Sequence, residues 1–304
     1  MSMVKMDFIN KASEDMEKLP LEATKPLPRL SGIKDLLMGP AGTGKTHAIG
    51  TLVDAGLEVF YVDLENGLES LIGYYTDHGK QLPENLHWFK IGQPKSGIST
   101  LLDGARRVNT LSYETLCKAV DPNRSSYNQY LLFLSSLGKF VDDRTGEDFG
   151  SVNDWDMNRV LVIDSMTQLA NICMKNMVGG KPAYAQNEWG VSQNQLMDLL
   201  TFLCNQCNCH VVVLAHVDRE VDQISGGTKL MVSSLGRALY SKLPSLFSDV
   251  ILSVREGNKW SWDTSTPLAD IKTRNLPIQA GLSPSFIPVI EKWRSRVKGM
   301  ESIT

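Results

Sequence analysis

The stretch GPAGTGKT at residues 39–46 decides the fold. It fits the pattern G-x-x-x-x-G-K-[ST], and it lies between a short apolar run at residues 36–38 and a segment at residues 46–55 that can continue as a helix. Strand, loop and helix in this order are the context in which the pattern forms a phosphate-binding loop. Its glycines let the backbone curl so that N–H groups and the helix N-terminus face phosphate oxygens.

These residues predict a site for a nucleoside triphosphate, expected to be ATP, together with Mg²⁺. Lys45 would reach the β- and γ-phosphates, and the Thr46 hydroxyl would coordinate Mg²⁺. A chance glycine-rich turn is the alternative, and the flanking strand and helix argue against it. The expected cofactor-binding residues are Gly39, Pro40, Ala41, Gly42, Thr43, Gly44, Lys45 and Thr46.

A carboxylate at the end of another buried strand is the expected partner of this loop, because it can hold the Mg²⁺ shell. Residues 160–163 form an apolar strand, and Asp164 follows it directly. The metal site is therefore expected to consist of Thr46 and Asp164. The alternative role for Asp164 is the N-cap of a following helix, a role that Ser165 can also fill.

Length and composition are those of one soluble α/β protein. The chain has 304 residues, 42% of them hydrophobic and 21% charged, with a net charge of −3. It lacks an overall basic field, so nucleic-acid binding would depend on local patches. No run approaches the roughly 18 apolar residues of a membrane span, and the first residues lack the apolar core of a signal peptide. We therefore expect a cytoplasmic protein with no membrane partner, and the odd number of cysteines, 5, fits a reducing compartment.

Three prolines, Pro20, Pro26 and Pro28, break any helix that begins in the first residues. The chain is therefore expected to comprise an N-terminal arm and linker at residues 1–30 and one ATPase domain at residues 31–304.

Several apolar runs are typical of parallel strands that are buried on both faces. Together with the helical stretches between them, they predict an α/β fold with a mostly parallel, twisted sheet flanked by helices. The buried strands are expected at residues 58–64, 86–91, 160–163 and 210–215, and two more at 247–254 and 268–273 around a Gly257-Asn258 turn.

One long segment, residues 92–158, interrupts this alternation and is expected to be an inserted helical segment, with helices near 98–120 and 126–141. The acidic run at residues 142–156 within it is expected to be a solvated loop rather than a metal site. A C-terminal helix is expected at about residues 284–300.

Three cysteines and a histidine close in sequence raise the question of a zinc site. Cys204 and Cys207 lie at the end of a predicted helix, whereas Cys209 and His210 open a predicted strand. No second ligand cluster completes a usual zinc spacing, so we do not expect a metal here.

Residues 60–65, FYVDLE, resemble the strand of RecA-type ATPases whose terminal glutamate activates water, which implies that Glu65 is the general base. Residues 163–167, IDSMT, are similar to the second motif of this class. Residues 213–216, VLAH, resemble the strand whose polar tip senses the γ-phosphate, and this implies a sensor role for His216. The alternatives are a surface acid at Glu65 and a hydrogen-bonded rim histidine at His216.

Residues 271–275, IKTRN, resemble the strand end whose two cations RecA filaments and ring helicases insert into the ATP site of the neighbouring subunit. The resemblance implies that Lys272 and Arg274 act catalytically in trans on the γ-phosphate, where such a charge can raise the rate roughly 10³-fold. On one strand the two side chains would share a face. The alternative is a pair of solvated cations.

Two segments hold the residues that are expected to contact single-stranded DNA. Residues 218–229 occupy the position of the disordered DNA-binding loop of RecA-type recombinases, and residues 175–190 follow the second motif. Glycines, a few cations and stacking rings suit contacts to a single strand, although acidic residues dilute the charge and a flexible surface loop is the alternative. The expected DNA contacts are Lys175, Lys181, Trp189, Arg219 and Lys229.

Four further stretches resemble the short RecA-core ATPases of bacteriophages, the Sak-type single-strand annealing proteins that are often called phage nucleotide-binding proteins. The likeness covers residues 33–283 except the insertion, and it implies a RecA-like P-loop NTPase fold. The four stretches are NEWG at 187–190, VVVLAH at 211–216, LPSLFSD at 243–249 and KTRNLP at 272–277.

This resemblance implies a DNA-stimulated ATPase that binds single-stranded DNA and promotes annealing or strand pairing in phage recombination or replication. It also implies a homo-oligomer, as a filament or a ring, a single-strand-binding protein as a partner, and the host-cell cytoplasm as the location. The spacing of Phe8 and Ala12 does not fit an F-x-x-A polymerisation motif. Two other functions stay open: a ring-forming helicase motor of the DnaB type, and a regulatory ATP-binding switch that does not bind DNA, which the net negative charge allows.

Overall fold

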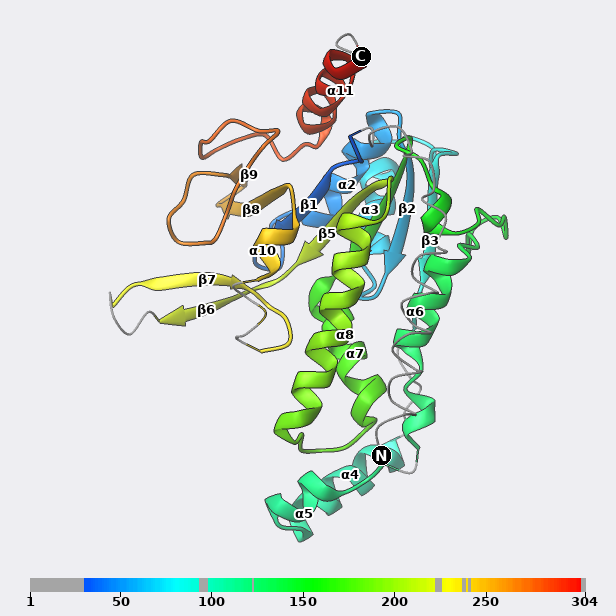
Figure 1. The fold of residues 1–304 in the computed structure, drawn as a ribbon, viewed down its shortest axis with the longest axis vertical. Helices are drawn as coiled ribbons and strands as arrows, with labels where there is room; N and C mark the ends of the chain where they lie inside the picture. Colours follow the sequence, from blue (N-terminus) through cyan, green and yellow to red (C-terminus); the bar gives the residue numbers. More distant parts are fainter. Residues whose placement is uncertain are drawn as a thin grey trace, which may run out of the picture. The chain divides into compact units, whose positions relative to one another are not determined.

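A seven-stranded sheet in the order β3-β2-β4-β5-β1-β8-β9 forms the centre of the unit Ser31–Thr304 (Figure 1). This computed structural model describes residues 30–92, 98–121, 123–221, 226–236, 239 and 242–301, so the predicted arm lies almost wholly outside the described residues. Neighbouring strands are parallel except β8 and β9. The strands are β1 (Lys34–Met38), β2 (Glu58–Asp63), β3 (Leu86–Lys90), β4 (Arg159–Asp164), β5 (His210–Ala215), β8 (Asp249–Glu256) and β9 (Lys259–Asp263).

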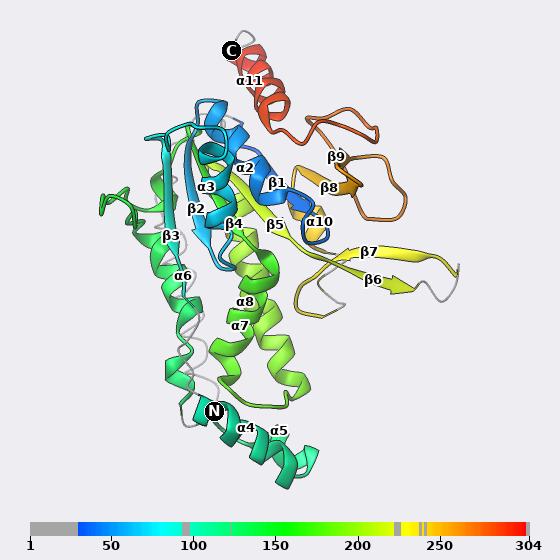
Figure 2. The same cartoon turned by 180° about the vertical axis from the view of Figure 1, so that it is seen from behind.

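Helices cover both faces of the sheet, as Figures 1 and 2 show from opposite sides. Alternate residues of one strand pack into different layers: Leu36 and Met38 belong to one buried cluster, and Leu37 belongs to the other. This explains why the strands are apolar on both faces. The first cluster includes residues of α6 (Gln129–Gly138), α7 (Met166–Val178) and α8 (Gln186–Asn205), and the second those of α2 (Lys45–Asp54), α3 (Leu68–Thr76) and α11 (Ile287–Glu301).

The strand order brings the predicted nucleotide-binding and metal-binding residues to one edge of the sheet. β5 lies between β1, which leads into the phosphate-binding loop, and β4, which ends in Asp164. Because β1, β2 and β4 run in the same direction, the loop, Glu65 and Asp164 all follow carboxyl ends of strands at that edge. The predicted fold class, an α/β fold with a mostly parallel sheet flanked by helices and a helical insertion, is confirmed.

The sheet differs from the prediction after β8. The strand that pairs with β8 across the Gly257 turn is β9, and residues 268–273 form only isolated bridges, one of them between Val250 and Lys272. Gly257 has a φ of 60°, a backbone conformation that suits a tight hairpin, so the residues directly after the turn take up the free edge of β8. The predicted strand at 268–273 is therefore wrong.

The segment after His216 is a second departure. We expected a polar loop, but β6 (Val217–Val221) and β7 (Thr228–Val232) form an antiparallel hairpin that extends away from the main sheet (Figure 1). Val217 pairs with Val232 at its base, where Val232 is buried, so the hairpin is anchored in the core. Residues 222–225 lie outside the description.

The insertion is helical, as predicted, with α4 (Ile98–Thr110), α5 (Tyr113–Lys118), α6 and two short 3₁₀ helices, η1 (Arg124–Ser126) and η2 (Val152–Asp154). Its acidic run is not simply a solvated loop, because Asp142 is fully buried and accepts hydrogen bonds from the backbone N–H groups of Trp88 and Arg144. The short helix α10 (Leu243–Leu246) precedes β8, and the predicted C-terminal helix is α11. None of the helices described is long and apolar enough to cross a lipid bilayer.

Helix α6 offers a test of whether the insertion is part of the core. Phe133 is fully buried, whereas Leu131 on the same helix is 53% exposed. Phe133→Ala should lower the free energy of unfolding by about 3–5 kcal/mol because it leaves a cavity, and the matched change Leu131→Ala should alter it by less than about 0.5 kcal/mol. Urea denaturation followed by circular dichroism measures both. Equal effects would show that α6 does not pack as described.

Candidate active site

The phosphate-binding loop has the backbone that its glycines allow. Gly42 and Gly44 have φ values of 75° and 81°, in the left-handed region where other residues are strained. A Cβ atom on Gly39 would lie 2.5 Å from the Ser253 carbonyl oxygen of β8, so this position has no room for a side chain. The predicted strand, loop and helix are therefore all present, and α2 begins at Lys45.

Lys45 folds back onto the loop. Its Nζ donates hydrogen bonds to the carbonyl oxygens of Gly39, at 2.7 Å, and Pro40, at 2.8 Å. Burial lowers the pKa of Lys45 to about 8, although the charges of Asp164 and Glu65 work in the opposite direction. The ammonium group is thus poorly solvated and ready to exchange two carbonyl partners for phosphate oxygens.

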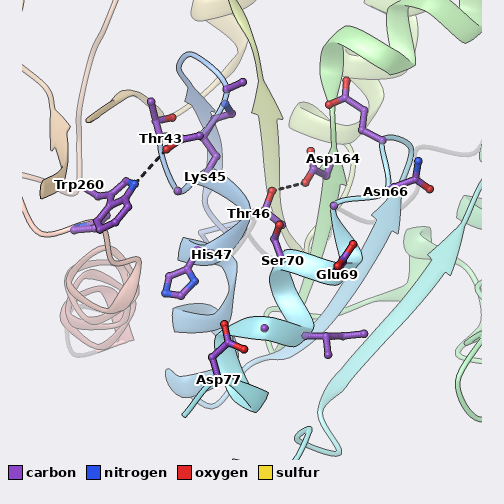
Figure 3. Close-up of a pocket in the computed structure, with 18 of the residues that line it drawn as sticks. Thr43, Lys45, Thr46, His47, Asn66, Glu69, Ser70, Asp77, Asp164 and Trp260 are labelled. Atoms are coloured by element: carbon purple, nitrogen blue, oxygen red, sulfur yellow. Dashed lines mark hydrogen bonds between the residues drawn. The ribbon is translucent and has the colours of Figure 1, made fainter. Parts of the chain in front are cut away.

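The two predicted metal-site residues meet. Thr46 Oγ1 donates a 2.8 Å hydrogen bond to Asp164 Oδ2 (Figure 3). The Tyr61 hydroxyl donates one of 2.6 Å to the same oxygen. Burial raises the pKa of Asp164, and these two hydrogen bonds oppose that rise. A hydroxyl and a carboxylate are oxygen ligands of the kind that Mg²⁺ prefers. Two protein ligands fit such a site, because Mg²⁺ beside a nucleotide takes its other ligands from phosphates and water.

Glu65 is held between two side chains. Its Oε1 accepts a 2.5 Å hydrogen bond from Ser165 Oγ, and its Oε2 lies 2.9 Å from His216 Nε2. Burial alone would raise the pKa of Glu65, but the hydrogen bonds from His216 and Ser165, with the charge of Lys45, outweigh it and lower the pKa. The carboxylate is therefore ionised at neutral pH, as a general base must be.

The turn that carries Glu65 is shaped by two residues that sequence reasoning missed. The buried Asp63 carboxylate accepts hydrogen bonds from the N–H groups of Glu65, at 3.1 Å, and Gly67, at 2.9 Å. A Cβ atom on Gly67 would lie 2.6 Å from Asp164 Oδ2 and 2.3 Å from the Tyr61 hydroxyl. The sequence holds one signal of this, because Tyr61 and Asp63 are polar residues within the otherwise apolar run at residues 59–64.

Lys45, Thr46, Glu65 and Asp164 all line one cavity of about 1080 Å³. This volume suits a nucleotide-sized ligand. Figure 3 shows the loop between Asp164 on one side and Trp260 on the other. The lining residues of the loop and α2 are 41–47, those near β2 and α3 include Glu65, Asn66, Gly67 and Glu69, and the remainder include Asp164, His216, Trp260 and Pro284.

Lys272 and Arg274 are not at this cavity. They lie beside the amino-terminal end of β8, whereas the loop follows the carboxyl end of the adjacent β1. Lys272 Nζ donates to the Ser245 carbonyl oxygen at 3.2 Å, and the Arg274 N–H donates to Asp249 Oδ1 at 2.7 Å. The structure therefore does not bring the two cations to the ATP site of their own chain.

Two of the predicted DNA-contacting cations are already paired. Lys181 is only 9% exposed, and its Nζ lies 2.6 Å from Glu188 Oε1. Lys229 on β7 lies 2.6 Å from Asp270 Oδ1. Because α8 begins at Gln186, the ion pair of Lys181 with Glu188 fixes the turn before that helix. A buried and paired lysine is unsuited to contact DNA.

The other three predicted contacts have different surroundings. Arg219 is exposed on β6, and Trp189 is 37% exposed with its ring against that of Tyr184. Lys175 lies over the ring of Tyr127, with Nζ 6.0 Å from the ring centroid. These residues come from three different elements, β6, α8 and α7, so they do not form one continuous motif.

The cysteine and histidine group has a structural role. Lys34 Nζ donates to the carbonyl oxygens of Cys207 and Cys209. Both ring nitrogens of His210 have backbone partners, the Ile33 N–H and the Met157 carbonyl, and burial lowers its pKa to about 3. His210 has no free nitrogen for a metal.

Comparison with known proteins gives the family of the chain. A family model described as an AAA domain matches residues 31–274, a range that includes the loop, Glu65, Asp164 and His216. No curated protein matches the chain. Among solved structures, the chain is similar to the crystal structure of the flagellar accessory protein FlaH from Methanocaldococcus jannaschii, with 11% identity, a TM-score of 0.32 and coverage of 81% of this chain and 80% of that one. The family match spans most of the chain, and the protein therefore belongs to the AAA domain family, with a nucleotide-binding P-loop core.

Proposed function

We propose that the protein is a Mg²⁺-dependent ATPase in which Glu65 activates the attacking water. The observation that carries this proposal is the position of Glu65, which lines the same cavity as Lys45, Thr46 and Asp164. The hydrogen bonds from His216 and Ser165 also lower the pKa of Glu65. In the reaction, the water oxygen forms a bond to the γ-phosphorus, the bond to the β,γ-bridging oxygen breaks, and the water proton passes to Glu65. Lys45 binds phosphate oxygens, and Thr46 and Asp164 would hold Mg²⁺, which offsets the phosphate charge.

We further propose that single-stranded DNA controls this reaction through the β6–β7 hairpin. His216, which contacts Glu65, is the residue directly before β6. A ligand that moves the hairpin would therefore change the hydrogen bond that restrains Glu65. Arg219 is an exposed cation on this hairpin, and in the wider proposal the protein anneals or pairs single strands as a filament or ring during phage recombination or replication, alongside a single-strand-binding protein.

A regulatory ATP-binding switch that does not bind DNA is the second candidate. The pairs Lys181–Glu188 and Lys229–Asp270 favour it, because they leave fewer cations for phosphate contacts. A ring-forming helicase would share the trans cations with the first candidate.

Phosphate release with and without single-stranded DNA separates these functions. At low salt, we expect DNA to stimulate turnover of Mg²⁺·ATP, Arg219→Ala to reduce the stimulation with basal turnover retained, and Lys45→Ala to abolish both. Turnover that persists with no DNA binding in a gel-shift assay would exclude the DNA-coupled functions and leave the switch.

The lowered pKa of Lys45 predicts a pH dependence of ATP binding. The free site has a lysine pKa of about 8, and phosphate oxygens favour the charged form, so binding is strongest below pH 8 and weakens as pH rises through that value. The dissociation constant for ATP should rise roughly tenfold between pH 7 and pH 9. Lys45→Arg, which stays charged over this range, should flatten the dependence whatever its affinity. Calorimetric titration measures both, and an equal slope in the two proteins would contradict the assignment.

Trans action of Lys272 and Arg274 can be tested by mixing subunits. Arg274→Ala should lower turnover roughly 10³-fold and leave ATP binding intact, because the cavity of its own chain does not contain Arg274. Adding Lys45→Ala subunits, which still carry both cations, should partly restore activity. Turnover that stays at the Arg274→Ala level at every mixing ratio would count against a shared site.

A further inference from the structure

Phosphate chemistry does not account for one side of the cavity. Trp260 lines it together with His47 and Pro284, and Figure 3 places Trp260 across the loop from Asp164. Trp260 is 46% exposed. A large aromatic surface that borders a ligand cavity needs an explanation, because such surfaces usually mark binding.

The indole is fixed to the phosphate-binding loop. Trp260 Nε1 donates a 3.2 Å hydrogen bond to the Gly42 carbonyl oxygen, and Ser253 Oγ of β8 donates one of 2.8 Å to the Thr43 carbonyl oxygen. A Cβ atom on Gly44 would lie 3.2 Å from Trp260 Cδ1, so the ring edge lies directly against the loop backbone. The β8–β9 hairpin thus holds the ring at a set position relative to the phosphate-binding N–H groups.

Arg255 orients the same ring. Its guanidinium carbon lies 5.2 Å from the Trp260 ring centroid, within the range of a cation–π contact. Its Nε also donates a 3.0 Å hydrogen bond to the Gly257 carbonyl oxygen of the hairpin turn. Arg255 is not among the residues that line the cavity, whereas Trp260 is, so the guanidinium supports the ring from outside the cavity. Because Trp260 lines the cavity and is partly exposed, its ring is accessible to a planar ligand there.

We propose that Trp260 stacks on the base of the nucleotide whose phosphates the loop holds. This inference rests on the proposed nucleotide site and adds the residue that recognises the purine ring in the same chain. Stacking between an aromatic side chain and a base is a sequence-tolerant interaction whose loss commonly weakens binding by roughly 5- to 150-fold. The opposing hypothesis is that Trp260 only braces the loop through Gly42.

Two substitutions and two ligands separate these hypotheses. Trp260→Ala removes the ring, and Trp260→Phe keeps a ring but loses the hydrogen bond to Gly42. Calorimetric titration is carried out with ATP, which has a base, and with inorganic triphosphate, which has none. Trp88 is a matched control. Arg144 lies over the Trp88 ring, 5.7 Å from its centroid, but Trp88 does not line the cavity.

For base stacking, we expect Trp260→Ala to weaken ATP binding at least roughly fivefold with little change for triphosphate. Trp260→Phe should retain most of the ATP affinity. ATP should quench the tryptophan fluorescence of the wild type and of Trp88→Phe, and this quenching should be lost in Trp260→Phe. Thermal denaturation of each variant shows whether it is folded, and Trp260→Phe keeps the test valid if the alanine variant is not.

Any of the following results would overturn the inference. Equal weakening of ATP and triphosphate would assign Trp260 to bracing the loop. Unchanged ATP affinity in Trp260→Ala, or unchanged quenching in Trp260→Phe, would show that the base lies elsewhere. Failure of the wild type to bind ATP, or binding that Lys45→Ala does not reduce, would refute the proposed nucleotide site itself and this inference with it.

Discussion

One buried carboxylate ties the site together. Asp164 ends β4, yet its Oδ2 accepts hydrogen bonds from Thr46, on the helix after the loop, and from Tyr61, on β2. The same oxygen leaves no space for a side chain at Gly67, so the turn that carries Glu65 must pass close to it. The parallel sheet brings three strand ends to one edge, and Asp164 sets the distances among the residues that follow them.

A second set of contacts runs from the cavity to the β6–β7 hairpin. Glu65 is held by Ser165 and His216, and the backbone N–H of His216 donates to Thr167 Oγ1 at 3.3 Å. His216 in turn leads directly into the β6–β7 hairpin. In the proposed mechanism, a base that is engaged by two partners is suited to control, because a shift of the hairpin can change its freedom without changing the nucleotide contacts.

Local patterns predicted the parts of the site that follow single strands. The loop glycines, Lys45, Asp164 and Glu65 each stand at the end of an apolar run, so their edge of the sheet could be inferred from the sequence. Contacts between segments that lie far apart in the sequence could not be inferred in this way. Trp260 on β9 reaches the loop because β9 pairs with β8, which in turn pairs with β1. Lys181 forms an ion pair with Glu188 in the first turn of α8. The prediction of a strand at 268–273 was wrong for a related reason, since β9 already pairs with most of the free edge of β8.

The role of Glu65 is the centre of this account, and single-turnover hydrolysis by Glu65→Gln tests it most directly. Glutamine preserves the shape of the side chain and can still hydrogen bond to Ser165, but it cannot accept the water proton. The account predicts ATP affinity within about threefold of the wild type and a hydrolysis rate at least roughly 10²-fold lower. An unchanged rate would contradict it, because the base would then have to be another residue of the cavity.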